Sequence, residues 1–141
     1  KLLMSPLGGI LVKLMTKSTL THNLRKVFGP NSQPSESDID NFWQLIIHNK
    51  GQLVLHRLIH YMAERVEHRN RWVTALQKTQ VPLRLTNGVL DPVSGEHLVQ
   101  RYYQLITDAD VVRVDHVGHY PHFEAPSAVV LSILSMIKIS R

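Results

Sequence analysis

The fold class of this chain is decided by two short runs, VPLRLT at residues 81–86 and VVRV at residues 111–114. Both are rich in β-branched or other apolar side chains and are bounded by turn residues, which predicts two β-strands. Pro82 is compatible with a strand because it lies near the first residue of that strand. Residues 94–106 carry apolar side chains at helical spacing, so the order strand, helix, strand predicts a parallel, right-handed crossover.

The residues that follow the second strand predict one more helix, from about Ala125 to Ile139. Two parallel strands do not make a stable sheet alone, and a parallel sheet carries helices on both of its faces. We therefore predict an α/β fold in which residues 79–141 form the edge of a larger parallel sheet.

Residues 1–78 have the pattern of helices. Apolar residues at helical spacing predict helices over 10–28 and 52–77, with the polar run at 68–71 as a break or an exposed turn. Between them, residues 29–37 are rich in Pro, Asn and Ser, which predicts a loop. Ser35 stands three residues before Asp38, as an N-cap residue does, and a helix with one apolar stripe follows. The chain is thus expected to divide into a helical region, 1–78, and a β-α-β-α region, 79–141.

The composition bounds the classes of function. The 141 residues contain no cysteine, which excludes disulfides, thiol catalysis and cysteine zinc sites. A net charge of +5 is modest and is by itself a poor argument for nucleic-acid binding. No run of 18 apolar residues occurs, so no transmembrane helix is predicted within these residues. The first residue is Lys1, and we therefore expect the chain to begin inside a longer protein.

Polar loops follow both predicted strands and contain the candidate catalytic residues. Asp91 follows the first strand, and His119 follows the second, 28 residues further along the chain. Ligands of open α/β sheets bind at the carboxyl ends of the strands, where these two side chains can meet. Asp91 could accept a hydrogen bond from one imidazole nitrogen of His119, which leaves the other nitrogen free to deprotonate water or a nucleophile.

The motifs around these two residues resemble a known superfamily. Gly88-x-x-Asp91-Pro92 and the later run GHYPHFEAP at 118–126 resemble the last two catalytic loops of the α/β-hydrolases. The branch that they resemble most contains epoxide hydrolases and haloalkane dehalogenases, in which a helical cap precedes those loops. The runs FGP at 28–30, PSES at 34–37 and RWVTAL at 71–76 are similar to a vertebrate member of the superfamily.

The resemblance implies a role for each loop. Asp91 would be the acid and His119 the catalytic base, in the superfamily's chain order of nucleophile, acid and histidine. The motif G-x-S-x-G is absent from these 141 residues. Ser94 lies in the run PVSG at 92–95, which does not have the first glycine of that motif, and it is predicted to be a helix cap. We therefore expect the nucleophile, an Asp or a Ser, and the oxyanion-hole donors in an N-terminal half outside this chain. These residues alone are then expected to be inactive.

The resemblance also implies a substrate and a place for it. The full-length protein would hydrolyse a small, largely apolar molecule beneath the cap of residues 1–78. Cap residues line the substrate pocket in the resembling branch, which makes Tyr61 and Trp43 candidate substrate-binding residues. Trp43 lies on the apolar stripe of its helix, so packing in the core is its default role.

A second hypothesis is a non-catalytic relative of these hydrolases that acts as a binding or membrane-associated protein. The resemblance points to the endoplasmic reticulum membrane, through a segment that is not in this chain. The residue upstream of Lys1 that occupies the nucleophile position would distinguish the enzyme from the binding protein.

Other features of the sequence have simpler interpretations. His116, His119 and His122 are spaced as metal ligands can be, but spacing of three in a loop does not make them converge, and no metal or cofactor is predicted. The basic residues between Arg65 and Arg71 lack the aromatic partners or reading motif of a nucleic-acid site. A solvated helix face is the favoured interpretation, with contact to an anionic membrane as a weaker alternative.

Overall fold

The computed structural model describes residue 9 and residues 12–139. The chain divides into two compact units, Lys1–Leu24 with Pro34–Trp72, and Arg25–Gln33 with Val73–Arg141. The sequence predicted a single division after residue 78. In the structure, the short segment 25–33 instead belongs with the C-terminal residues. The roles assigned to the two predicted regions, cap and hydrolase core, stay predictions.

The first unit is helical. Its elements are η2 (Val12–Leu14), most of α2 (Lys17–Val27), α3 (Glu36–Ile47), η3 (His48–Val54), α4 (Leu55–Leu58), α5 (Tyr61–Glu67) and the start of α6 (Arg69–Lys78). Its buried apolar residues include Val12, Leu20, Leu24 and Ile39. The predicted N-cap is confirmed, because Ser35 and Asp38 form a capping box in which each side chain accepts a hydrogen bond from the other residue's backbone.

Two of the predicted helices are shorter than expected. The helix predicted over 10–28 begins only at Lys17, because the Thr16 hydroxyl accepts a hydrogen bond from the N–H of Thr19 and so caps the helix there; residues 10 and 11 lie outside the described residues. The single helix predicted over 52–77 is wrong. Near His60 the backbone bonds tighten to a three-residue spacing, and a second break at His68 falls within the polar run where one was expected.

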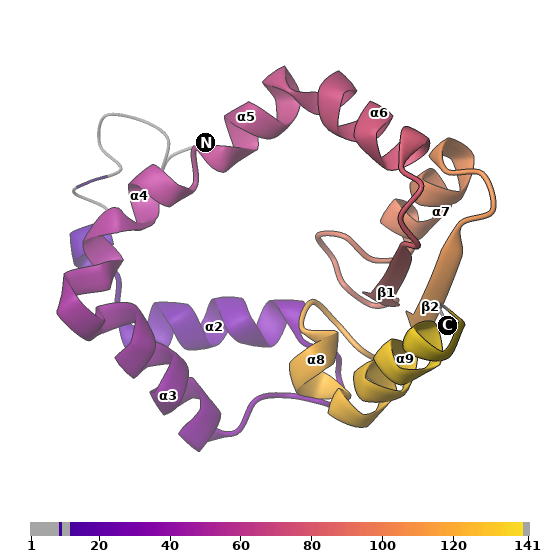
Figure 1. The fold of residues 1–141 in the computed structure, drawn as a ribbon. Coiled ribbons are helices and arrows are strands. Elements are labelled where there is room, and N and C mark those ends of the chain that lie inside the picture. Colours follow the sequence, from indigo (N-terminus) through magenta and orange to yellow (C-terminus); the bar gives the residue numbers. More distant parts are fainter. Residues whose placement is uncertain (1–8, 10–11, 140–141) are drawn as a thin grey trace. The chain divides into compact units, whose positions relative to one another are not determined.

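The second unit contains the sheet (Figure 1). Strands β1 (Arg84–Gly88) and β2 (Asp110–Val114) are adjacent and parallel, with α7 (Glu96–Leu105) between them in the sequence. This confirms the predicted parallel pair. The first strand lies later than predicted because Arg84 is the first residue that pairs with β2, and its guanidinium forms an ion pair with Asp110 at 2.8 Å. The two turn-prone residues at 87 and 88 extend the strand because both pair with β2.

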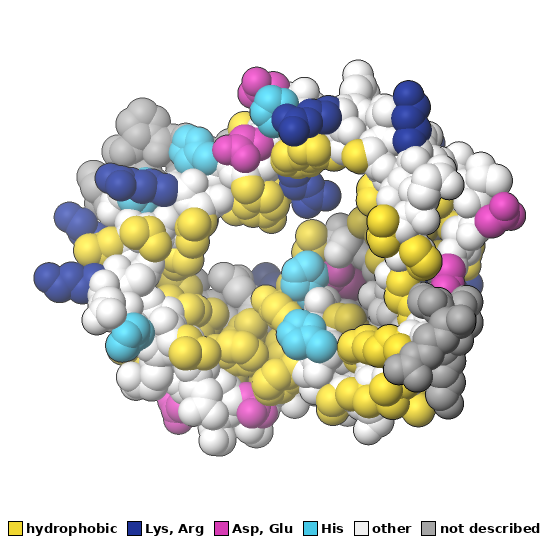
Figure 2. Space-filling model, in the orientation of Figure 1, with side chains coloured by type: hydrophobic (Ala, Val, Ile, Leu, Met, Phe, Trp, Pro, Cys, Tyr) yellow, Lys and Arg dark blue, Asp and Glu magenta, His cyan; other side chains and the backbone are white. Residues whose placement is uncertain are grey.

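Two helices complete this unit, α8 (Pro121–Glu124) and α9 (Pro126–Ile139), and both contact β1. Apolar side chains of α9 remain exposed, as the yellow surface over this helix shows (Figure 2). They are Val130, Leu131, Ile133, Leu134 and Ile137, each about half exposed or more. Within the described residues, no helix is both long enough and apolar enough to cross a membrane.

Candidate active site

The loops that follow β1 and β2 are tied to each other through their backbones. The N–H of Val89 donates to the carbonyl oxygen of Val114 at 3.1 Å, and the N–H of Leu90 donates to that of Val117 at 2.9 Å. Gly88 permits this approach, because a Cβ atom on it would lie 2.0 Å from the carbonyl oxygen of Gly118. Since the strands are parallel, both loops lie at the carboxyl ends of the strands, where open α/β sheets bind ligands.

Asp91 is the buried acid of this region, with 6% of its surface exposed. One carboxylate oxygen, Oδ1, accepts the backbone N–H of Val93 at 2.7 Å. The other, Oδ2, accepts the Ser94 hydroxyl at 2.5 Å and meets Nδ1 of His119 at 2.7 Å. Both oxygens are therefore occupied, and the carboxylate is fixed in one orientation.

The charge of Asp91 sets the proton on His119. Burial raises the pKa of the Asp91 carboxyl, but hydrogen bonds from Ser94, His119 and the backbone of residues 93 and 94 outweigh it and hold that pKa below its ordinary value. An ionised carboxylate only accepts hydrogen bonds, so Nδ1 of His119 must carry the hydrogen. In the neutral imidazole, Nε2 then has a free lone pair, as a general base requires.

The backbone and ring of His119 are held separately from its reactive nitrogen. Its N–H donates to the carbonyl oxygen of Val27 at 2.8 Å. Its ring meets that of Tyr120 edge to face, with 4.9 Å between centroids. About one third of the side chain is exposed, against 4% for the side chain of Asp91. Asp91 is therefore the buried residue that orients the imidazole, and His119 is the accessible residue that can react.

An aromatic cluster lies beside the histidine. The ring of Phe28 is 5.2 Å from that of Tyr120 and 5.7 Å from that of Phe123, measured between centroids. Burial and the negative charge of Asp91 raise the pKa of the Tyr120 hydroxyl above its ordinary value of 10.0. Tyr120 is therefore neutral at pH 7, and it presents a largely apolar surface to His119.

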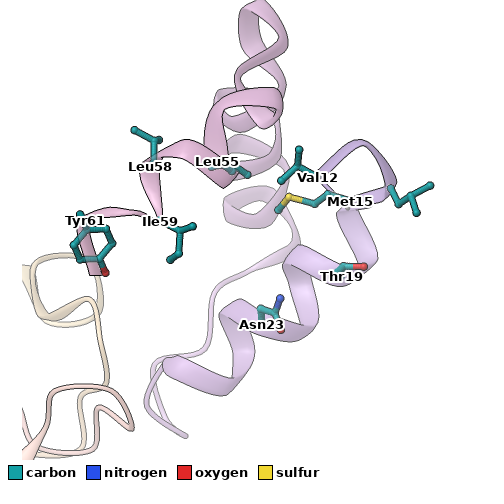
Figure 3. A pocket seen from close by; sticks show the side chains of 9 residues that line it. Val12, Met15, Thr19, Asn23, Leu55, Leu58, Ile59 and Tyr61 are labelled. Carbon is teal, nitrogen blue, oxygen red and sulfur yellow. The ribbon is translucent and has the colours of Figure 1, made fainter. Parts of the chain in front are cut away.

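The two candidate substrate-binding residues differ in their surroundings. Tyr61 lines a cavity of about 410 Å³ in the first unit, together with Val12, Leu14, Met15, Thr19, Asn23, Leu55, Leu58 and Ile59. Figure 3 shows that Val12, Met15 and Leu55 gather on one side of this cavity, with Ile59 and Tyr61 further along it. Trp43 is half-buried on α3 and is not among the lining residues. Substrate binding by either residue stays a prediction.

Ser94 has a different role from the predicted helix cap. Gly95 is the residue that precedes α7, and no side chain caps this helix. The Ser94 hydroxyl instead donates to Asp91, so sequence reasoning missed a residue of the site. The signal was the spacing Asp91-x-x-Ser94, since a serine three residues after an aspartate in a turn can reach back to its carboxylate.

The neighbouring histidines are placed differently from His119. His116 has a backbone φ of 63° in the turn after β2, and His122 is exposed on α8. His122 contacts the ring of Tyr120 at a centroid distance of 6.1 Å. Across residue 9 and residues 12–139, no three His, Asp or Glu side chains are grouped as metal ligands would be.

Comparisons with known sequences find relatives, although no family model matches the chain. It is 33% identical over 137 residues to the LipZ protein of Mycobacterium tuberculosis, provisionally named a hydrolase, and this match covers 97% of the chain and 48% of LipZ. It is 32% identical over 133 residues to the mesoderm-specific transcript protein of Mus musculus, covering 93% of the chain and 40% of that protein. The chain thus spans about half the length of these relatives or less.

Two solved structures share the fold. A serine hydrolase involved in carbazole degradation, the CarC enzyme, aligns with a TM-score of 0.65 and 18% identity over 88% of this chain and 48% of its own. A protein of Acinetobacter baumannii provisionally named a lipase, lip1, aligns with a TM-score of 0.65 and 17% identity over 96% and 46%. This chain has the fold of the C-terminal part of an α/β-hydrolase.

The α/β-hydrolase fold gives the geometry a context. The predicted relationship to hydrolases is supported by LipZ among the sequence relatives, and the predicted fold is supported by both structures. The epoxide hydrolase and haloalkane dehalogenase branch stays a prediction, because these relatives carry other names. The expected contact between Asp91 and His119 is present at 2.7 Å, while their catalytic roles stay a prediction.

Proposed function

We propose that the full-length protein is a hydrolase in which His119 activates water and Asp91 orients and stabilises its imidazole. The observation that carries the proposal is the 2.7 Å hydrogen bond between Asp91 Oδ2 and His119 Nδ1, at the carboxyl ends of two parallel strands. A buried, fully hydrogen-bonded carboxylate beside a partly exposed imidazole is the arrangement that general-base catalysis requires.

The proposed step is the hydrolysis of a covalent intermediate. Nε2 of His119 takes a proton from water, and the water oxygen forms a bond to the electrophilic carbon of an enzyme-bound ester. The bond between that carbon and the leaving-group oxygen breaks, and His119 gives its proton to that oxygen, which belongs to the serine nucleophile of an acyl-enzyme or to the alcohol product of an aspartyl ester. Asp91 stabilises the imidazolium that forms in between, because its negative charge lies 2.7 Å from Nδ1.

The nucleophile of this reaction is proposed to lie outside the 141 residues, since no G-x-S-x-G occurs in them. A Ser nucleophile would make the protein an esterase or lipase. An Asp nucleophile would make it an epoxide hydrolase or a dehalogenase, in which the ester forms on the enzyme's own carboxylate.

A small, largely apolar substrate is proposed, and the first unit supports this. The cavity lined by Tyr61 is bounded mostly by aliphatic side chains, and its polar groups are Thr19, Asn23 and the hydroxyl of Tyr61. Such a lining suits an apolar body with one or two polar atoms. We propose that Tyr61 contacts substrate, and that Trp43 supports the helix on which it lies.

The test is turnover by the full-length protein on three probes: p-nitrophenyl butyrate, styrene oxide and 1-chlorobutane. We expect hydrolysis of at least one probe, and the probe that reacts identifies the nucleophile class. His119→Ala should lower kcat by far more than 100-fold, because general-base catalysis contributes roughly 10²–10⁴-fold and the covalent intermediate also stalls. His122→Ala, the matched control at the exposed histidine of the adjoining helix α8, should leave kcat nearly unchanged.

Two results would contradict the proposal. A folded wild-type protein with no turnover on any probe would favour the alternative, a non-catalytic relative that binds a ligand or a membrane. A His119→Ala protein with wild-type turnover would remove the assignment of His119 as the base, and His122 would be examined next.

A further inference from the structure

The carboxylate of Glu124, the last residue of α8, accepts four hydrogen bonds, and Glu124 has no role in the proposed reaction. Its Oε2 accepts the backbone N–H of Gly29 at 2.7 Å, the Ser32 hydroxyl at 2.6 Å and the backbone N–H of Gly118 at 2.9 Å. Its Oε1 accepts the backbone N–H of Tyr120 at 3.0 Å. The Glu124 carboxylate thus joins the histidine loop, residues 116–120, to Gly29 and Ser32, which precede Glu124 by more than 90 residues in the sequence.

These contacts hold the carboxylate in its charged form. Burial raises the pKa of the Glu124 carboxyl, but the hydrogen bonds from Ser32 and from the backbone N–H groups of Gly118, Gly29 and Tyr120 outweigh it, so that this pKa lies below its ordinary value. Hydrogen bonds to an ionised acceptor are stronger than those between neutral groups. Glu124 is therefore a partly buried anion saturated with donors.

The two loop residues that Glu124 holds are the immediate neighbours of His119. Gly118 and Tyr120 donate to Glu124, and the N–H of His119 between them donates to the carbonyl oxygen of Val27 at 2.8 Å. Three successive N–H groups of the loop are thus anchored to groups outside it. The side chain of His119, on this anchored backbone, reaches Asp91.

We propose that Glu124 is a positioning residue that fixes the backbone of His119 so that its imidazole meets Asp91 in one tautomer. The inference rests on the proposed function for its catalytic consequence, but not for its structural part. A displacement of about 1 Å in a reacting group can cost roughly 100-fold in rate, which sets the size of the effect.

Glu124→Gln is the informative substitution because it keeps the shape and removes two acceptor sites. The glutamine amide has one carbonyl oxygen, and its NH₂ group would face N–H donors that it cannot bond. Ser32→Ala is a milder variant that removes one donor and leaves the three backbone N–H groups in place. Ser37→Ala, at an exposed serine of α3 in the other unit, is the matched control.

The first readout is independent of turnover. In full-length protein labelled with ¹⁵N-histidine, the ring nitrogen shifts of His119 report its tautomer. We expect the Nδ1–H tautomer in wild type and in Ser37→Ala, and a mixture of tautomers in Glu124→Gln. Ser32→Ala should show a smaller change in the same direction.

The second readout is kinetic and uses the probe that the wild-type protein hydrolyses. Glu124→Gln should lower kcat by roughly 10–100-fold with little change in KM, because the base and not the substrate pocket is displaced. In a His119→Ala background, Glu124→Gln should cause no further loss of kcat.

The outcomes separate this inference from the proposed function. An unchanged His119 tautomer in Glu124→Gln, or an additive loss of kcat in the His119→Ala background, would overturn the positioning role and leave the hydrolase proposal standing. A changed tautomer in a protein without turnover would support the positioning role and contradict the hydrolase. If Glu124→Gln fails to fold, Ser32→Ala decides the question by the same two readouts.

Discussion

The hydrogen bonds that Asp91 makes with Val93, Ser94 and His119 act on His119 in two ways. The bonds from Val93 and Ser94 keep the carboxylate ionised and oriented, and the bond to Nδ1 of His119 uses that charge. In Asp91→Asn, the amide would turn its NH₂ group or its oxygen toward the imidazole and permit the wrong tautomer. We expect kcat to fall by roughly 10⁴-fold in the full-length enzyme, which still folds but melts at a lower temperature because the hydrogen bonds to a charged carboxylate are lost. A loss below about tenfold would contradict the role of Asp91 as the acid.

Ser94→Ala tests the second donor through the pH dependence of stability. The folded-state pKa of Asp91 is lowered, so its contribution to stability is present above its ordinary pKa of 3.8 and is lost as the pH falls through the folded-state value. Removing the Ser94 donor makes that pKa less depressed. We expect Ser94→Ala to lower the free energy of unfolding by about 1.5–3 kcal/mol at pH 7, as for a hydrogen bond to a charged group.

The difference in the free energy of unfolding between wild type and Ser94→Ala should become smaller at acid pH, because Asp91 is then protonated in both the folded and unfolded states. Urea unfolding at pH 7 and at a pH below the lowered folded-state pKa of Asp91 measures it, with Ser37→Ala as the control. A difference between wild type and Ser94→Ala that stays constant over this range would show that the hydroxyl acts through packing and not through the charge of Asp91.

The site was only partly predictable from single residues. Asp91 and His119 could be assigned because each follows a strand in a recognisable turn, and strand order places the two turns together. Ser94 was misassigned because a serine just before a helix is usually a cap. Glu124 could not be found, since its partners Gly29 and Ser32 come from a segment that only the folded chain brings to the loop.

The two loops after the strands depend on glycines where backbones cross. A Cβ atom on Gly118 would lie 2.1 Å from the carbonyl oxygen of Val27 and 2.7 Å from the nitrogen of Gly29, and these backbone atoms cannot rotate away. Gly118→Ala must therefore push the histidine loop off the segment 27–29. We expect a loss of about 1–3 kcal/mol in the free energy of unfolding, the usual range for overpacking, together with a lower kcat.

Thermal melting and turnover of the full-length protein measure both effects. Gly9→Ala is the matched control, because the nearest atom to a Cβ there is 3.8 Å away, on the flexible side chain of His56. Wild-type stability in Gly118→Ala would show that the loop can shift freely, which would also weaken the positioning argument for Glu124.

The elements themselves show which patterns were sufficient. The parallel pair followed from two short β-branched runs around a helix, because few topologies join such elements. The helical region was predicted in kind but not in detail. Apolar spacing is the same in one long helix and in several short ones, and breaks such as that near His60 arise from local three-residue hydrogen bonds that the spacing does not encode.

Taken as a whole, the chain covers about half of LipZ, of the CarC structure and of the lip1 structure, and its sheet has two strands within the described residues. A two-stranded parallel sheet buries little apolar area, and parallel sheets are normally covered on both faces. The exposed apolar residues of α9 are consistent with this, since Leu131 is 66% exposed and Ile133 is 53% exposed. Contiguous apolar surface of this kind drives association when nothing covers it.

We therefore expect residues 1–141, expressed alone, to self-associate through α9. Sedimentation velocity should show oligomers whose fraction rises with protein concentration, and heating should give a broad transition. Leu131 and Leu134 are each at least half exposed on that helix. Replacing both by Lys removes two apolar side chains from its surface and should raise the monomer fraction. Val66→Lys is the control, because Val66 is 78% exposed but lies on α5 in the other unit. A monomeric chain with a sharp, cooperative transition would contradict the prediction, and equal effects of the α5 and α9 substitutions would show that the added charge, and not α9, governs association.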